Sequence, residues 1–246
     1  MGRFLVCLAV GAVVLGSSFA FAQTIDELRF TKKLKLAQVG DDDAQMAVAL
    51  AYERGEAARL DLAEAAKWYR KAALAGNVEA QYRLARIVSK GAKGLTRDLP
   101  TAAKLYEAAA KSGHVEAQNA TGLLYQNGLG VSTDEAKAAE WYRKAAEAKL
   151  ASAENNLGLM YLNGKGVPRD PKEAFRLFER AANQGDGWGL NNLGGMYEMG
   201  WGVDKDPTKA VTYYRQALEK GVASAQSNLV RLDPTTASVA APVAAD

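Results

Sequence analysis

The chain has 246 residues, of which 48% are hydrophobic and 24% are charged, a balance typical of a folded globular protein and not of a fibrous or disordered one. Its formal net charge of +3 gives no reason to expect a nucleic acid partner. The single cysteine, Cys7, and the single histidine, His114, exclude an internal disulfide framework and a zinc site built from these residue types.

Residues 1–22 are predicted to be a secretory signal peptide that is cleaved after Ala22. Arg3 is followed by the apolar run FLVCLAVGAVVLG, and the small residues Ala20 and Ala22 precede the cleavage position. An uncleaved anchor is the alternative, but the run is shorter than the roughly 20 residues that a spanning helix needs. We therefore expect export to the periplasm, with secretion as the alternative, and no membrane insertion after cleavage.

The remaining chain repeats one pattern every 36 or 37 residues, most clearly in NNLGLMYLNGKGV from Asn155 and NNLGGMYEMGWGV from Asn191. Five copies are predicted at residues 44–79, 80–116, 117–152, 153–188 and 189–224. The flanking segments are predicted to be an N-terminal capping helix within residues 23–43, a C-terminal capping helix at 225–232 and a disordered tail at 233–246.

Each copy contains two apolar stripes with helical spacing. In the fourth copy Ala153 and Leu157 share one face of a first helix, helix A. Farther on, Ala174, Phe178 and Ala181 share one face of a second helix, helix B. Helices of about three turns are not stable alone in water, so the copies are expected to stack on one another.

Glycine and aspartate mark the ends of these helices. A glycine that can form a left-handed cap follows each helix A, at Gly55, Gly91, Gly128, Gly164 and Gly200. An aspartate that can accept bonds from free backbone N–H groups precedes each helix B, at Asp61, Asp98, Asp134, Asp170 and Asp206. Helix B ends at a glycine except in the third copy, where Lys149 predicts a different turn or a strain of about 1 kcal/mol.

Three copies also carry a glycine inside helix A, namely Gly122, Gly158 and Gly194. A glycine inside a helix lowers the stability of that helix by roughly 1 kcal/mol relative to alanine. A close approach of helix B is the expected compensation.

The skeleton A-x-x-N-L-G-x-M-Y-x-x-G-x-G-V-x-x-D, read from Ala153 and nearly repeated from Gly189, resembles the Sel-one-like repeat, a relative of the tetratricopeptide repeat with a longer loop. The resemblance covers roughly residues 24–232 and is most specific in the loops GLGV, GKGV and GWGV of the last three copies. The first two copies have GEAA and GAKG instead, so different loops are expected there. The resemblance implies an all-α fold: a right-handed α-solenoid (superhelix) of tetratricopeptide-like helical hairpins, with five repeats plus capping helices.

The resemblance further implies an interaction scaffold and not an enzyme. Exported bacterial members regulate envelope sensor kinases, take part in polysaccharide export or act on host cells. We therefore expect a non-enzymatic scaffold or regulator in the cell envelope that binds a protein or peptide, such as an envelope sensor or assembly complex. A secreted effector that binds host proteins is one alternative.

A cell-wall or β-lactam-acting hydrolase is the other alternative, because a cysteine-rich branch of the family has been described with such activity. This chain lacks the paired cysteines of that branch. His114 is interpreted as a solvated turn residue, and the GxG loops lack the Gly-Lys-Ser/Thr ending that phosphate binding requires. No catalytic residue, cofactor or metal is expected.

Candidate partner-binding residues lie on helix A away from its buried stripe, the side that lines the concave surface of tetratricopeptide-like stacks. They are Tyr82, Arg83, Arg86, Asn119, Asn155, Asn156, Asn191 and Asn192, and Asn228 has a corresponding place in the C-terminal cap. An amide both donates and accepts, which suits the backbone of an extended peptide. For Asn156 and Asn192 we favour the alternative that they bond to the neighbouring repeat or to loop backbone.

Tyr82, Arg83 and Arg86 are the better candidates for partner specificity, with a solvated or packing role as the alternative. Trp201, in the loop MGWGVD, is a further candidate as an exposed anchor. Packing of its ring back onto the repeat is the alternative for that residue.

Overall fold

The computed structural model describes residues 27–56 and 58–235 of the chain, which are helical apart from the loops between helices. The predicted signal peptide and residues 236–246 of the predicted tail lie outside this range. The chain forms two compact units, residues 1–108 and 109–246. None of the helices in the described range is long and apolar enough to cross a membrane.

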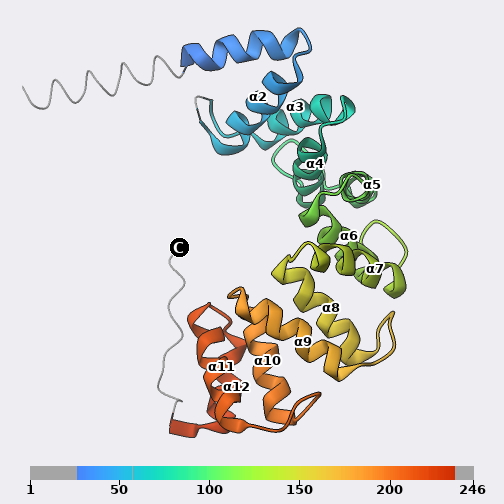
Figure 1. The fold of residues 1–246 in the computed structure, drawn as a ribbon. Coiled ribbons are helices and arrows are strands. Elements are labelled where there is room, and N and C mark those ends of the chain that lie inside the picture. The colour runs from blue at the N-terminus through green and yellow to red at the C-terminus, as the bar shows by residue number, and fades with distance from the viewer. Residues whose placement is uncertain (1–26, 57, 236–246) are drawn as a thin grey trace, which may run out of the picture. The chain divides into compact units, whose positions relative to one another are not determined.

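The described helices alternate between the two predicted kinds. The A helices are α2 (Asp42–Arg54), α4 (Val78–Lys90), α6 (Val115–Asn127), α8 (Ala151–Asn163), α10 (Gly187–Met199) and the shorter α12 (Ser224–Leu232). The B helices are α3 (Leu62–Leu74), α5 (Leu99–Lys111), α7 (Glu135–Glu147), α9 (Pro171–Asn183) and α11 (Pro207–Glu219). In the first unit α3 packs against α2 and α4, and in the second unit α7, α9 and α11 each pack against the A helix before and the A helix after (Figure 1). This confirms the predicted all-α solenoid of helical hairpins.

Helical residues 27–38 occupy the place of a B helix before the first complete repeat. The carbonyl of the buried Ala37 accepts a hydrogen bond from Nε2 of Gln45 on α2, at 3.4 Å. Nε2 of Gln81 on α4 bonds the carbonyl of Ala73 in the same way, at 3.4 Å and 36 residues farther along the chain. The described part of the chain therefore starts with a B helix and ends with an A helix.

The glycines inside the A helices let the aromatic side chains of the B helices approach, as predicted. A Cβ atom added to Gly158 would lie 2.7 Å from the ring of Phe178, and one added to Gly194 would lie 2.8 Å from the ring of Tyr214. Gly122 meets the ring of Tyr142 in the same way, at 2.7 Å. These distances are shorter than carbon atoms approach each other, so only glycine fits at this helix spacing.

The predicted caps are present at the helix ends. The side chains of Asp61, Asp134, Asp170 and Asp206 each accept a hydrogen bond from a backbone N–H of the following B helix. The capping glycines Gly55, Gly128, Gly164 and Gly200 are left-handed, with φ between 67° and 71°. Gly91 differs, with φ 73° and ψ 170°, because its loop closes through backbone bonds between Ala92 and Leu95. Lys149 has φ 63°, the only positive φ of a non-glycine residue in the described range, so the predicted strained turn is present.

The second glycine of the GxGV loops has a separate role. A Cβ atom on Gly166 would lie 2.1 Å from the carbonyl oxygen of Glu135, at the start of α7. A Cβ atom on Gly202 would lie 2.3 Å from the carbonyl oxygen of Pro171, at the start of α9. Each loop thus lies directly on the first turn of the preceding B helix, which leaves no room for a side chain.

Candidate binding surface on the A helices

Three pairs of asparagine side chains join consecutive A helices in the second compact unit. Asn156 on α8 donates from Nδ2 to Oδ1 of Asn119 on α6, at 3.0 Å. Asn192 on α10 donates to Asn155 on α8 at 2.8 Å, and Asn228 on α12 donates to Asn191 on α10 at 3.1 Å. The two residues of each pair are 37 positions apart, so the same bond recurs at successive junctions. We call this series the asparagine ladder and each pair a rung.

Each rung fixes two amide groups and uses only part of their hydrogen-bonding capacity. The accepting asparagine keeps both N–H groups of Nδ2. The donors Asn156 and Asn192 also keep Oδ1 and one N–H group, whereas Oδ1 of Asn228 accepts from Nη2 of Arg231 at 2.9 Å. None of these six amides has an atom that is buried without a partner in the described part of the chain. The bonds to the neighbouring repeat that we favoured for Asn156 and Asn192 are therefore present, and a role of the ladder in partner binding stays a prediction.

Tyr82 and Arg86, two of the three candidate residues on α4 in the first compact unit, lie against each other. The guanidinium of the exposed Arg86 lies 5.8 Å from the ring centroid of Tyr82. The Tyr82 ring in turn meets the ring of Tyr106 on α5 edge to face, with 6.0 Å between centroids. Arg86 therefore presents a cation at the surface of α4, supported by an aromatic side chain.

Arg83 is engaged in the junction between two A helices. Its guanidinium pairs with Glu79 on the same helix and with Glu53 on α2, the latter with 3.1 Å between Nη1 and Oε2. Glu53 also accepts a hydrogen bond from the hydroxyl of Tyr69 on α3. Arg83 consequently ties α4 to the preceding repeat, whereas a contact with a partner stays a prediction.

A second cluster of this type, which sequence reasoning missed, lies at the end of the chain. Glu198 on α10 accepts from the hydroxyl of Tyr214 on α11 at 2.7 Å and pairs through both oxygens with Arg231 on α12. Burial, followed by the hydrogen bond with the glutamate, raises the pKa of the Tyr214 hydroxyl. In both clusters the tyrosine follows its glutamate by 16 residues, a spacing that could have revealed them.

The fourth repeat replaces a common inter-repeat bond by an ion pair. Gln118 on α6 donates to the carbonyl of Ala110, as Gln45 and Gln81 do in earlier repeats, but the corresponding residue of α8 is Glu154. A glutamate has no N–H group to donate. Arg180 of α9 neutralises the Glu154 carboxylate and supplies the N–H group that the glutamine donates in the other repeats. It pairs with Glu154 and donates to the carbonyl of Ala146 at 2.9 Å.

Trp201 lies in the loop between α10 and α11 and is 44% exposed. Trp188 at the start of α10, which sequence reasoning did not select, is 56% exposed. The exposed tryptophan in the loop is thus accessible to a partner. Its function as an anchor stays a prediction.

His114 is the N-cap of α6, which corrects the interpretation of a solvated turn residue. Its side chain is only 12% exposed, and Nδ1 accepts a hydrogen bond from the backbone N–H of Ala117 at 3.3 Å. An imidazole can act in this way because its unprotonated nitrogen is an acceptor. No group of three His, Cys, Asp or Glu side chains in residues 27–56 and 58–235 is arranged to hold a metal ion.

Comparisons with known proteins agree with this architecture. The model of the Sel1 repeat, named the Sel-one-like repeat above, matches residues 42–77, 78–114, 115–150, 151–186 and 189–222. A search of curated proteins found no significant match.

Several solved structures are similar to the chain. A protective antigen of uropathogenic Escherichia coli with an SLR fold is 31% identical with a TM-score of 0.74, over 88% of this chain and 49% of that chain. A Sel1 repeat protein from Oxalobacter formigenes is 27% identical with a TM-score of 0.73, over 83% of this chain and 86% of that one. An immunity protein from Pseudomonas aeruginosa, 22% identical with a TM-score of 0.51 over 80% of this chain and 74% of that one, shares the fold. The chain spans about half the length of the E. coli antigen.

Proposed function

Because the chain belongs to the Sel1 repeat family, we propose that it is a non-enzymatic scaffold or regulator that binds a protein or peptide partner through its A helices in the bacterial cell envelope. Sel1 repeat proteins are generally protein-interaction scaffolds, and their solenoids are typically non-catalytic. The proposed location rests on the signal peptide predicted for residues 1–22.

The asparagine ladder is the observation that carries this proposal. Its rungs hold the amides of the half-buried Asn119 and Asn191 in fixed orientations, with Nδ2 N–H groups that are not used in the rung. Asn155 is only 7% exposed, which corrects its predicted place away from the buried stripe, so it mainly supports the ladder. The donating asparagines Asn156 and Asn192 add an Oδ1 acceptor that the rungs do not use, whereas Oδ1 of Asn228 accepts a hydrogen bond from Arg231. A fixed donor and a fixed acceptor are what the backbone of an extended peptide requires at each point of contact. Because the rungs are formed before binding, little side-chain entropy is lost when a peptide binds.

The spacing of the A helices also suits an extended chain. Packed helices are roughly 8 to 10 Å apart. An extended peptide advances by about 3.3 Å per residue. Successive rungs would therefore meet every third residue of the peptide.

The test exploits the polarity of the rungs. Asn191→Asp keeps the oxygen that accepts from Asn228 but replaces the unused donor by a carboxylate oxygen. Asn183→Asp makes the same chemical change at an exposed site on the B helix α9, and it serves as the matched control. Tagged protein with either change would be crosslinked in envelope extracts and analysed by mass spectrometry. We expect a partner that the parent and Asn183→Asp capture and that Asn191→Asp loses. Capture by all three, or by none, would contradict the proposal.

A further inference from the structure

Charged residues are distributed unequally between the two kinds of helix in the second compact unit. Each of the A helices α6, α8 and α10 has 13 residues and contains one charged residue, which is a glutamate in every case. The B helices α7 and α9 have the same length and contain six and five charged residues. Charge is thus concentrated on the B helices, whereas the asparagine ladder lies on the A helices.

We call the side of α6, α8 and α10 that carries the asparagine ladder the ladder face. Glu154 on α8 and Glu198 on α10 are buried and paired with Arg180 and Arg231. Glu116 is exposed, but it lies in the first turn of α6, at one end of that helix. The helices α8 and α10 therefore contribute no exposed acidic or basic residue to the ladder face.

Three large apolar side chains are exposed on the ladder face. Leu123 follows Asn119 by four residues, so the two side chains lie on one side of α6. Trp188 precedes Asn192 by four residues and Met199 follows it by seven, so these three share one side of α10. Apolar side chains that are exposed singly are ordinary, but here they gather on the side with few charges. The core of a protein interface has this composition, with few charged residues and with aromatic residues and methionine enriched.

Gly195 leaves open space between two of these side chains. It follows Trp188 by seven residues and precedes Met199 by four, on the same side of α10. A Cβ atom added to Gly195 would have the Tyr214 hydroxyl as its nearest neighbour, at 3.6 Å. A side chain of a bound segment therefore has room at Gly195, with an apolar side chain on either side of it along the helix.

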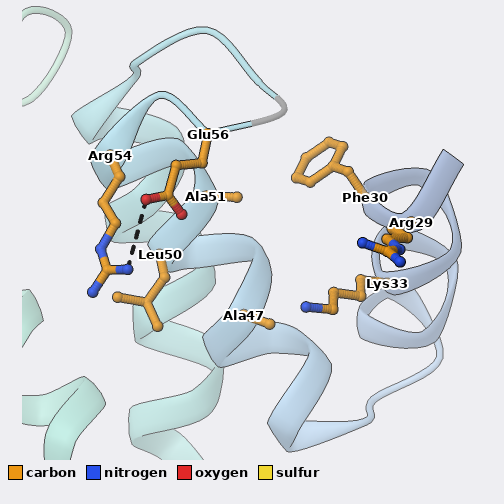
Figure 2. Close-up of a pocket in the computed structure, with 8 residues that line it drawn as sticks. All are labelled: Arg29, Phe30, Lys33, Ala47, Leu50, Ala51, Arg54 and Glu56. Atoms are coloured by element: carbon orange, nitrogen blue, oxygen red, sulfur yellow. Dashed lines mark ion pairs between the residues drawn. The ribbon is translucent and has the colours of Figure 1, made fainter. Parts of the chain in front are cut away.

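The corresponding side of α4 in the first compact unit is charged. Arg86 and Lys90 occupy the repeat positions of Gly195 and Met199, and both are exposed. A groove in the same unit, between helical residues 27–38 and α2, is also rich in charge. Figure 2 shows four charged side chains among the eight that line this groove, namely Arg29, Lys33, Arg54 and Glu56. The scarcity of charge is therefore a property of the ladder face and not of A helices in general.

We propose that the ladder face binds an extended segment of the partner that is uncharged and rich in apolar side chains. This inference rests on the proposed function and adds the chemistry of the bound segment. Amides of the ladder bond the backbone of the segment, and its apolar side chains remove Leu123, Trp188 and Met199 from water. A charged side chain of the segment would lose hydration without meeting an exposed opposite charge on α8 or α10.

The experiment selects binders from random 12-residue peptides displayed on phage, with the purified chain immobilised. Twelve extended residues span about 40 Å, which exceeds the distance across three helices that lie roughly 8 to 10 Å apart. Phage that bind serum albumin are removed beforehand. The most enriched peptide is then synthesised with fluorescein, and fluorescence anisotropy measures its affinity. A second version of this peptide has lysine in place of its two most strongly selected apolar residues.

Four variants of the chain locate the binding surface. Leu123→Lys places a charge on the ladder face of α6, and Gly195→Leu fills the open space on α10 without a change of charge. Leu74→Lys makes the first change at an exposed position of the B helix α3, and it is the matched control. Asn191→Asp tests the ladder itself. Circular dichroism would show that all four keep the helix content of the parent.

We expect the enriched peptides to contain fewer Asp, Glu, Lys and Arg residues than the unselected library and more Leu, Ile, Val and Phe. The parent and Leu74→Lys should bind the enriched peptide with affinities within twofold of each other. Leu123→Lys and Gly195→Leu should each bind it at least tenfold more weakly. The parent should bind the lysine version at least tenfold more weakly than the original peptide.

The failure of this inference can be distinguished from the failure of the proposed function. Enriched peptides that are charged, or that bind Leu123→Lys and Gly195→Leu as tightly as the parent while Asn191→Asp loses them, would contradict the inference alone. If no peptide is enriched, or if none of these substitutions weakens binding, both are contradicted. A concentration-dependent dimer in sedimentation equilibrium that Leu123→Lys abolishes would also overturn the inference, because a second copy of the chain would then cover the ladder face.

Discussion

Single glycines set the distance between the two helices of a hairpin. Gly194 and Gly195 are neighbours in α10, but only the first faces the ring of Tyr214 closely. A Cβ atom would lie 2.8 Å from that ring at Gly194, whereas at Gly195 its nearest neighbour would be the Tyr214 hydroxyl at 3.6 Å. The same substitution therefore has opposite expected effects at adjacent positions.

Gly194→Ala should destabilise the protein by about 1 to 2 kcal/mol, because overpacking outweighs the gain in helix propensity. Gly195→Ala should stabilise it by roughly 0.5 to 1 kcal/mol, because alanine restricts the unfolded chain and the space is free. Urea unfolding monitored by circular dichroism would measure both. Equal effects of the two substitutions would refute the role of Gly194 as a spacer.

Lys149 is a second position where the backbone decides the preferred residue. Its φ of 63° is left-handed, a conformation that disfavours side chains with a Cβ atom. Lys149→Gly should therefore raise the free energy of unfolding by up to about 1 kcal/mol. Lys149→Ala keeps the Cβ atom and should give no comparable gain. A stabilisation by alanine as large as that by glycine would point to the lysine charge instead.

At the scale of elements, the junction between α7, α8 and α9 depends on a buried charge. The Glu154 side chain is 1% exposed, and Arg180, which is 49% exposed, neutralises it and also bonds the Ala146 carbonyl. Arg180→Met should cost roughly 2 to 4 kcal/mol, because it leaves a buried carboxylate and a carbonyl without this cation. Arg176→Met on the same helix removes only an exposed pair with Glu173 and should cost less than about 1 kcal/mol.

Adding Glu154→Gln to Arg180→Met should restore most of the lost stability. A glutamine at this position can donate to the Ala146 carbonyl, as Gln118 donates to that of Ala110. Chemical unfolding of the four proteins in this double-mutant cycle would measure the coupling. Additive effects of the two substitutions would show that Glu154 and Arg180 do not act together.

The tyrosines that connect A and B helices should lose their hydroxyl protons at higher pH in the folded protein than in the unfolded chain. Burial raises the pKa of the Tyr142 hydroxyl, and burial followed by hydrogen bonding to glutamate raises those of Tyr69 and Tyr214. A raised folded-state pKa means that stability is complete below the ordinary tyrosine pKa of about 10 and is lost as pH rises toward the folded value. Absorbance at 295 nm should therefore show fewer tyrosinates at pH 11 in the folded protein than in urea. Equal tyrosinate numbers would contradict these shifts.

At the scale of the whole molecule, stacking of equivalent repeats predicts tolerance to the loss of one repeat. Deletion of residues 153–188 places Asn192 in register with Asn119, so a rung can form again. The shortened chain should keep its helix content per residue and unfold cooperatively at lower denaturant concentration. Deletion of residues 153–170 removes nearly all of α8 together with the following loop and the N-cap Asp170, leaves α9 without its partner helix and should abolish cooperative unfolding. Loss of structure in both would show that the repeats are not interchangeable.

The stack of helical hairpins could be predicted from the sequence, because the repeat period, the capping aspartates and the spacer glycines are local patterns that recur along the chain. The sequence was not sufficient for the bonds between copies. The ladder joins Asn155 to Asn192 and not to Asn156 or Asn191, and this register depends on the rotation of one A helix against the next. The replacement of glutamine by the pair of Glu154 and Arg180 was missed for a similar reason, since its members lie on different helices.

The central claim, that a partner binds along the asparagine ladder, can be tested most directly through the side-chain amides themselves. NMR would record the Nδ2 signals of Asn119, Asn155 and Asn191 as the captured partner is added, with Asn183 on α9 as an internal reference. The account predicts that the three ladder signals shift together and saturably while that of Asn183 stays in place. Saturable binding that leaves the ladder signals unchanged would place the binding surface elsewhere and contradict the account.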